Sequence, residues 1–295
     1  QSSDPIESKL TGRLGAALSS SEKAFRKKIG SIDLAIGGPP CQGHSNLNNH
    51  TRRDDPKNSL YDRMARLAEV VQPANLIIEN VPGVRHDVGG VYDRTVKRLR
   101  KIGYNVETAR VEANMIGVPQ RRHRELVVAS LTHSVGEGFF DELLQEYRCE
   151  ERSVRWAVSD LVGMKRFHPI DAVTQVSRES KKRIDWLFDN DQYDLPDRMR
   201  PDCHKLNNHS YKSVYGRLYW DKPAWTITTG FQVMGQGRFL HPVERRVITS
   251  HEAARLQFIP DFFSFSTNSR KGYSKMIGNA VPSKLAYVLA SKLLR

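Results

Sequence analysis

A cysteine in a rigid turn is the first feature of this chain that could do chemistry. Cys41 lies in segment 37–43, Gly-Gly-Pro-Pro-Cys-Gln-Gly, directly after the apolar run Ile32–Ile36. A cysteine between a strand and a helix gains thiolate character from backbone N–H groups and the helix N-terminus. The prolines fix the turn, and the glycines let a ligand approach the backbone. Most free cysteines are buried and inert, but the polar residues after Cys41 favour a nucleophile.

A carboxylate ends a second apolar run. Glu79 closes the segment Asn75–Glu79 and is followed by Asn80 and Pro82. A carboxylate at the end of an apolar strand is poorly hydrated, so we expect it to serve as a proton donor near neutral pH. The alternative is that Glu79 caps the next turn or pairs with an arginine, and the residues alone leave both open.

Three arginines fall within four residues after Gln120. Gln120, Arg122 and Arg124 occupy alternate positions, which face one side of an extended strand. They could therefore grip a phosphate or a base edge together. The ordinary alternative is a solvated run of charges, because arginines are rarely buried without partners.

The elements that position these residues alternate between strand and helix patterns. Apolar residues recur at helical spacing near 60–71 and 91–102, between the expected strands Ile32–Ile36, Asn75–Glu79, Tyr104–Ala113 and Glu125–Ser130. This order predicts a mostly parallel sheet flanked by helices, and such sheets bind ligands beyond the carboxyl ends of their strands. Cys41 and Glu79 both stand at such ends.

The periodicity weakens after Leu131, where charged and aromatic residues are interleaved. We expect a second, smaller and more irregular domain there. Helical signals return with the capping-box spacing of Thr249 and Glu252 and with the apolar face of Pro282–Leu294.

The composition is that of an ordinary globular protein, with 295 residues of which 39% are hydrophobic and 27% charged. A net charge of +13 favours a polyanionic partner, since lysines and arginines on phosphates release condensed counterions. No run approaches the ~20 apolar residues of a membrane span, and no signal segment opens the sequence. Three cysteines are too few for a disulfide framework or a zinc site, so we expect a reducing cytoplasm and no metal. For a partner of DNA type we also expect association with the nucleoid.

Taken together, the motifs resemble those of the bacterial-type DNA (cytosine-5) methyltransferase family. The resemblance covers roughly 31–130 and 211–295, and two further family-like stretches lie at 215–228 and 246–257. The motifs that carry it, in family order, are 37–43, Glu79-Asn80-Val81, Gln120-x-Arg122-x-Arg124 and Gly278-Asn279-Ala280-Val281-Pro282.

The resemblance implies an α/β fold, a Rossmann-like class I methyltransferase sheet with a smaller, irregular α+β target recognition domain. The catalytic domain would comprise 1–130 and 248–295, and the recognition domain 131–247. The partner would be double-stranded DNA containing a specific sequence, and the co-substrate S-adenosylmethionine. A restriction-modification system would be the usual setting.

The resemblance also assigns roles to particular residues. Cys41 would attack C6 of a cytosine, which must be flipped out of the duplex. Glu79 would hold the N3 and amine edge of the ring, while Arg122 and Arg124 would orient the base and the nearby backbone. The methyl-donor site would be lined by Pro40, Leu60 and Asn279.

The sequence departs from the family at its start. Family members open with a strand and an aromatic-x-Gly-x-Gly loop that holds the methyl donor, and no segment here matches it. We therefore expect Gln1 to follow the first strands of the sheet, either because the chain is a fragment or because a separate polypeptide supplies them. We also expect weak binding of S-adenosylmethionine. His44 stands where the family usually has an apolar aromatic residue, and we expect it to be tolerated.

Two other functions remain open. A non-catalytic DNA-binding relative would keep the basic surface, although it would have had no reason to keep Cys41, Glu79 and the arginines. An RNA cytosine-5 methyltransferase would use the same fold, and the long segment before Tyr215 favours DNA over RNA.

Overall fold

A computed structural model describes residues 6–44, 54–132, 135–205 and 213–295, which form two compact units. The first unit contains Gln1–Glu112, His123–Tyr147 and Tyr287–Arg295, and the second contains Ala113–Arg122 and Arg148–Ala286. No helix in the described ranges is both long and apolar enough to span a membrane.

A four-stranded sheet in the order β1-β2-β5-β3 forms the centre of the first unit. Strands β1 and β2 are parallel, whereas β5 is antiparallel to both of its neighbours, so three strands share one direction. The predicted mostly parallel sheet is thus a mixed one. The four expected strands are confirmed with bounds Leu34–Gly37 for β1, Asn75–Asn80 for β2, Asn105–Glu112 for β3 and His123–Ser130 for β5.

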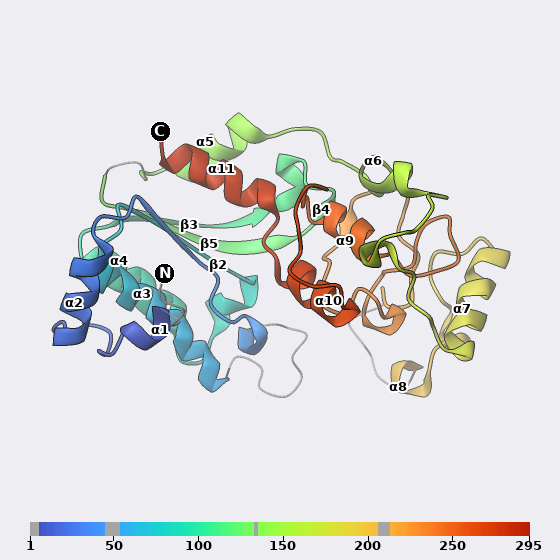
Figure 1. Ribbon diagram of the computed structural model, residues 1–295, viewed down its shortest axis with the longest axis horizontal. Coiled ribbons are helices and arrows are strands. Elements are labelled where there is room, and N and C mark those ends of the chain that lie inside the picture. Colours follow the sequence, from blue (N-terminus) through green and yellow to red (C-terminus); the bar gives the residue numbers. More distant parts are fainter. Residues whose placement is uncertain (1–5, 45–53, 133–134, 206–212) are drawn as a thin grey trace. The chain divides into compact units, whose positions relative to one another are not determined.

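Helices cover both faces of this sheet. Helices α3 and α4 lie on one side, and α5 and the C-terminal turns of α11 lie on the other (Figure 1). The side chains of α3 and α4 that meet β2 and β5 form an apolar core, which includes Tyr61, Leu99 and Val127. The helices of this unit are α1 Ile6–Lys9, α2 Ser20–Ile29, α3 Leu60–Val71, α4 Val91–Lys101, α5 Phe139–Tyr147 and α11 Ser283–Leu293, whose first residues belong to the second unit.

A buried ion-pair network attaches α2 to α3. Arg66 is fully buried and bonds both Glu22, at 2.5 Å, and Glu69, at 2.7 Å. The same Glu22 completes a capping box with Ser19 at the start of α2. Both glutamates compensate the arginine, so the charge can stay inside the protein.

The second unit is built mainly from short helices. Helices α6, α9 and α10 share one apolar core, and α7 contributes Ile184 and Leu187 to another. The capping box predicted at Thr249 and Glu252 is confirmed. The elements of this unit are β4 Gln120–Arg121, α6 Val154–Val158, α7 Arg178–Asp189, α8 Asp202–Lys205, β6 Ala224–Trp225, α9 Ser250–Leu256 and α10 Arg270–Asn279, with β4 and β6 pairing in parallel.

The boundaries of the units differ from the domain limits expected from sequence. Residues 131–147 belong to the first unit because α5 packs on β3, and 250–286 belong to the second because α9 packs on α6 and α10. The second unit is therefore about as long as the first and not smaller. Of the expected recognition region, 133–134 and 206–212 lie outside the described residues.

Candidate functional site

Cys41 stands in the turn that follows β1, as the sequence predicted. Its side chain is half-buried, and its carbonyl accepts a hydrogen bond from the His44 backbone N–H at 3.1 Å. The described residues after it form only a three-residue 3-10 turn, η1, over Gln42–His44. The expected activation by a helix macrodipole is therefore not provided by this turn, because the dipole needs a longer run of aligned peptides.

The Cys41 turn and Glu79 lie at the same edge of the sheet. The parallel pairing aligns Gly37 with Ile78, so the carboxyl ends of β1 and β2 coincide. The Asn80 side chain donates a hydrogen bond to the Pro39 carbonyl at 3.2 Å. A Cβ placed at Gly38 would lie 3.5 Å from Oε2 of Glu79, so the turn passes close to that carboxylate. Asn80 belongs to the motif Glu79-Asn80-Val81, but the sequence alone did not predict its hydrogen bond to the Cys41 turn.

Glu79 pairs with Arg124. The carboxylate and Nε of Arg124 form an ion pair in which the side chains are 15% and 9% exposed, on the neighbouring strands β2 and β5. Of the two alternatives open from sequence, the structure shows the arginine partner. Arg124 also donates to the His123 carbonyl at 2.8 Å, which holds the guanidinium in place.

Arg122 is committed to protein partners within the second unit. Its side chain is 3% exposed and donates to the carbonyls of Ile227, at 2.8 Å, and Ala280, at 3.0 Å. Gln120 is alongside, fully buried, and bonds the Leu256 carbonyl and the Ile227 N–H. Gln120, Arg122 and Arg124 are all buried, which fits the prediction that their alternate positions face one side. Gln120 and Arg122, however, form hydrogen bonds within the second unit, whereas Arg124 bonds residues of the first. A clamp on DNA stays a prediction for Arg122 and Arg124.

The Gly278-Asn279-Ala280 segment is held from two sides. Arg122 bonds it through Ala280, and Gln257 donates to the Ile277 carbonyl at 2.7 Å. Any side chain at position 278 would meet the Thr229 backbone nitrogen at 2.3 Å, so only glycine fits. Gln257, like Gln120, was missed as a supporting residue, and its only sequence signal was its place in a family-like stretch.

Three residues expected at the methyl-donor site offer suitable groups. Pro40 is exposed beside Cys41, and Leu60 is half-buried at the first position of α3, both in the first unit. Asn279 is exposed at the end of α10 in the second. Two apolar surfaces and an amide suit an adenine ring and the polar groups attached to it. Their chemistry fits S-adenosylmethionine.

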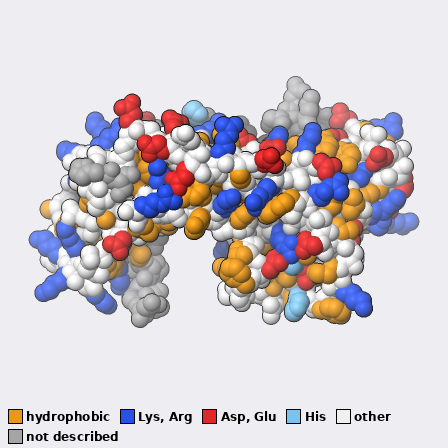
Figure 2. All heavy atoms as spheres, turned by 90° about the horizontal axis from the view of Figure 1, so that it is seen from above, with side chains coloured by type: hydrophobic (Ala, Val, Ile, Leu, Met, Phe, Trp, Pro, Cys, Tyr) orange, Lys and Arg blue, Asp and Glu red, His pale blue; other side chains and the backbone are white. Residues whose placement is uncertain are grey.

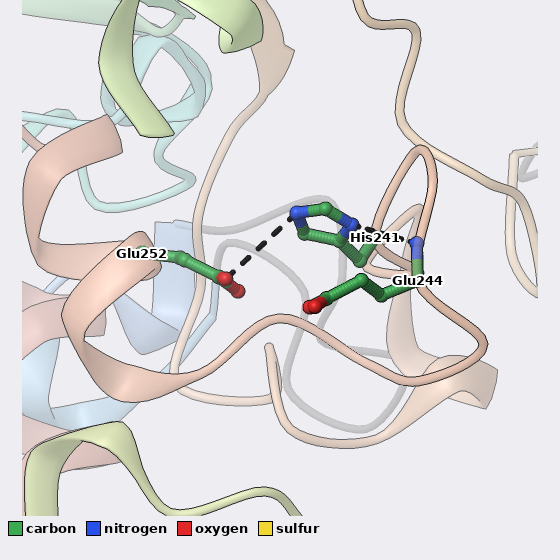
Figure 3. A group of neighbouring side chains, drawn as sticks. All are labelled: His241, Glu244 and Glu252. Carbon is green, nitrogen blue, oxygen red and sulfur yellow. Dashed lines mark hydrogen bonds and ion pairs between the residues drawn. The ribbon is translucent and has the colours of Figure 1, made fainter. Parts of the chain in front are cut away.

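His241, Glu244 and Glu252 form a cluster with the composition of a metal site (Figure 3). Nδ1 of the fully buried His241 accepts hydrogen bonds from the backbone N–H groups of Glu244 and Val243, at 2.9 and 3.2 Å. Arg246 pairs with both carboxylates. Burial lowers the pKa of His241 to about 4, so the ring is neutral at pH 7. The bonds to Nδ1 and the ion pairs of Arg246 together hold the turn before α9 in place.

Figure 2 shows basic side chains on one face of the molecule. Figure 2 shows Lys and Arg distributed across the visible face among acidic and apolar side chains, not gathered in one patch. The net charge of +13 attracts polyanions at long range.

Comparison with known proteins shows the family of this chain. The family model described as C-5 cytosine-specific DNA methylase matches residues 17–295. Type II methyltransferase M1.BsuMI of Bacillus subtilis is 46% identical over 292 residues, which cover 99% of this chain and 68% of that protein. Type II methylase M.HgiDII of Herpetosiphon aurantiacus is 32% identical, over 89% of this chain and 76% of that protein.

Solved structures share the fold. A DNA modification methyltransferase encoded within an E. coli prophage superposes with a TM-score of 0.61 at 22% identity, covering 92% of this chain and 81% of that one. The S. pombe Dnmt2 methyltransferase gives 0.57 at 20% identity, with 92% and 80% covered. The fold is thus the Rossmann-like mixed α/β fold of class I methyltransferases.

Cys41 and the Glu79–Arg124 ion pair lie at one end of a Rossmann-like sheet, and the family match identifies the class of this protein as a methyltransferase. The chain belongs to the C-5 cytosine-specific DNA methylase family, as a DNA (cytosine-5) methyltransferase of the bacterial type.

Proposed function

We propose that this chain methylates C5 of cytosine within a specific sequence of double-stranded DNA, using S-adenosylmethionine and a covalent bond from Cys41 to C6. One observation carries the proposal most directly. The Cys41 turn and the Glu79–Arg124 pair lie at the same carboxyl edge of β1 and β2 and are joined by the bond from Asn80 to Pro39. A nucleophile and an oriented carboxylate are what addition to a cytosine ring requires.

The proposed reaction begins when the Cys41 thiolate adds to C6 of a cytosine flipped out of the duplex. The new S–C6 bond places electron density on C5, which takes the methyl group. A base then removes the C5 proton, the C5–C6 double bond re-forms, and the S–C6 bond breaks to return the thiolate. S-adenosylmethionine supplies the methyl group on a sulfonium centre, whose sulfur leaves as a neutral thioether.

Glu79 and Arg124 act as a pair in this proposal. The carboxylate holds the N3 and amine edge of the ring, where charge changes as the thiolate adds. Arg124 fixes the orientation of that carboxylate through their ion pair. Pro40, Leu60 and Asn279 would hold the methyl donor, and Arg122 would support the Asn279 segment from inside the protein.

The test is methyl transfer and covalent trapping with the purified intact enzyme. Tritiated methyl groups should enter cytosine-containing duplex DNA, and duplex with 5-fluorocytosine at the target should stay bound, because fluorine cannot leave C5 as a cation. Cys41→Ser should abolish both signals, and Cys149→Ser, at an exposed free cysteine, should keep both. Equal incorporation by Cys41→Ser would refute the nucleophile assignment. Incorporation into RNA but not duplex DNA would refute the substrate.

A further inference from the structure

The imidazole of His44 is buried directly behind the Cys41 turn. It is 0% exposed, and neither ring nitrogen has a hydrogen bond of good geometry. Its Nδ1 lies 3.5 Å from Oδ1 of Asp87. Burying a ring nitrogen without a full partner costs free energy that an apolar ring of the same shape would avoid. The position therefore carries a polar group at a cost to stability.

Asp87 is itself a buried junction. Its side chain is 2% exposed and accepts hydrogen bonds from Nδ2 of Asn58 at 2.6 Å and from the Val91 N–H at 3.3 Å. Asn58 lies in the 3-10 turn η2, Pro56–Ser59, and Asp87 directly follows η3, Pro82–His86. The carboxylate thus fastens the turn after β2 to the starts of α3 and α4.

His44 connects this junction to the nucleophile. Its backbone N–H bonds the Cys41 carbonyl at 3.1 Å, and its ring stands edge-on to Tyr61 with centroids 6.4 Å apart. Burial lowers the pKa of His44, and the carboxylates of Asp87 and Asp55 oppose that change. The ring is neutral near pH 7 and has one N–H, for which Asp87 is the facing acceptor.

We infer that His44 is a positioning residue, whose contact with Asp87 holds the Cys41 turn at a fixed place relative to Glu79. Glu79 is the next-to-last residue of β2, and η3 begins two residues after the strand ends and is capped by Asp87. The His44–Asp87 contact and the Asn80–Pro39 bond therefore brace the nucleophile turn from its two ends. This inference rests on the proposed role of Cys41 as nucleophile.

The test is a mutant cycle on the intact enzyme. His44→Phe keeps the ring and removes the donor, Asp87→Asn keeps the shape and removes the charge, and the double variant combines them. Each single variant should lower kcat about tenfold, with KM for DNA and for S-adenosylmethionine within about twofold, because a small displacement of the nucleophile acts on the chemical step and not on binding. The double variant should be no slower than the slower single one, because both changes break the same contact.

Two further variants separate positioning from packing. His44→Asn places an amide N–H where Nδ1 stands and should recover most of the activity that His44→Phe loses. His86→Phe, at an exposed histidine on the same turn as Asp87, should match the wild type. Wild-type kcat in His44→Phe, or multiplicative losses in the double variant, would overturn the inference. An inactive Cys41→Ser beside an unchanged His44→Phe would refute only this inference, whereas an active Cys41→Ser would refute the proposed function.

Discussion

Replacing Arg122 by methionine distinguishes a structural arginine from a DNA clamp. Methionine has a similar length and no donors, so the buried carbonyl of Ile227 and the part-buried carbonyl of Ala280 lose the bonds that now measure 2.8 and 3.0 Å. Each acceptor left by a charged donor costs on the order of 1–3 kcal/mol, so the two together cost about 2–6 kcal/mol. Release of the buried guanidinium offsets part of this, so we expect a net loss of about 2–4 kcal/mol.

The assay is urea unfolding followed by circular dichroism, together with duplex DNA binding at fixed salt. In thermal unfolding, the same loss of stability would lower the melting temperature of a unit of this length by roughly 5–12 °C. Arg121→Met is the matched control. Its side chain is 49% exposed and lies 3.6 Å from Glu151, so its removal should change stability by no more than about 0.5 kcal/mol.

The reasoning is refuted if Arg122→Met unfolds like the control while its affinity for DNA collapses. That result would mean that the guanidinium leaves its carbonyls to contact the substrate, as the family resemblance implied. Loss of stability with DNA affinity retained in the folded protein would confirm the structural role.

Three more predictions concern pH, packing and the methyl donor. Between about pH 6.5 and 4 the unfolded chain binds a proton at His241 that the folded protein does not, so the free energy of unfolding should decrease by up to about 3 kcal/mol as the pH is lowered through this range. The free energy of unfolding of His241→Asn should depend less on pH over the same range, and an equal pH dependence would contradict the burial of the ring as the cause. Gly278→Ala should lower the free energy of unfolding in urea by about 1–3 kcal/mol, because its Cβ would collide with the Thr229 backbone. Gly136→Ala, where a Cβ would meet open space, should leave stability unchanged, and equal urea midpoints for the two variants would exclude the collision. Among the described strands β1 pairs only with β2, and Ile36 on it is 57% exposed. We therefore expect calorimetry to find that residues 1–295 bind S-adenosylmethionine more weakly than low-micromolar, and low-micromolar affinity would contradict the idea that this exposed edge weakens binding.

Local sequence patterns predicted the helices and strands closely, because such patterns depend on residues that are near one another in the sequence. The apolar stripe from Leu60 to Val71 became α3, and the box at Thr249 and Glu252 capped α9 as expected. Helical spacing and a capping side chain act within a few residues, so no tertiary contact has to be known. The placement of Cys41 and Glu79 at strand ends followed in the same way.

The direction of β5 was not accessible to this reasoning. An apolar run such as Glu125–Ser130 is compatible with either direction, since burial on both faces leaves the same residues in parallel and antiparallel strands. The structure pairs it antiparallel with β2 and β3, which brings Arg124 opposite the end of β2, within reach of Glu79.

By itself, the sequence determined the order of the elements and the residue types at the carboxyl edge of the sheet, and it supported membership of a cytosine-5 methylase family. Only the tertiary structure decided which side chains meet. It paired Arg124 with Glu79, turned Arg122 onto the carbonyls of Ile227 and Ala280, and set His44 against Asp87. The physical reason is that a buried charge must be compensated by whichever groups packing brings near, and those groups lie from 43 to more than 150 residues away along the chain.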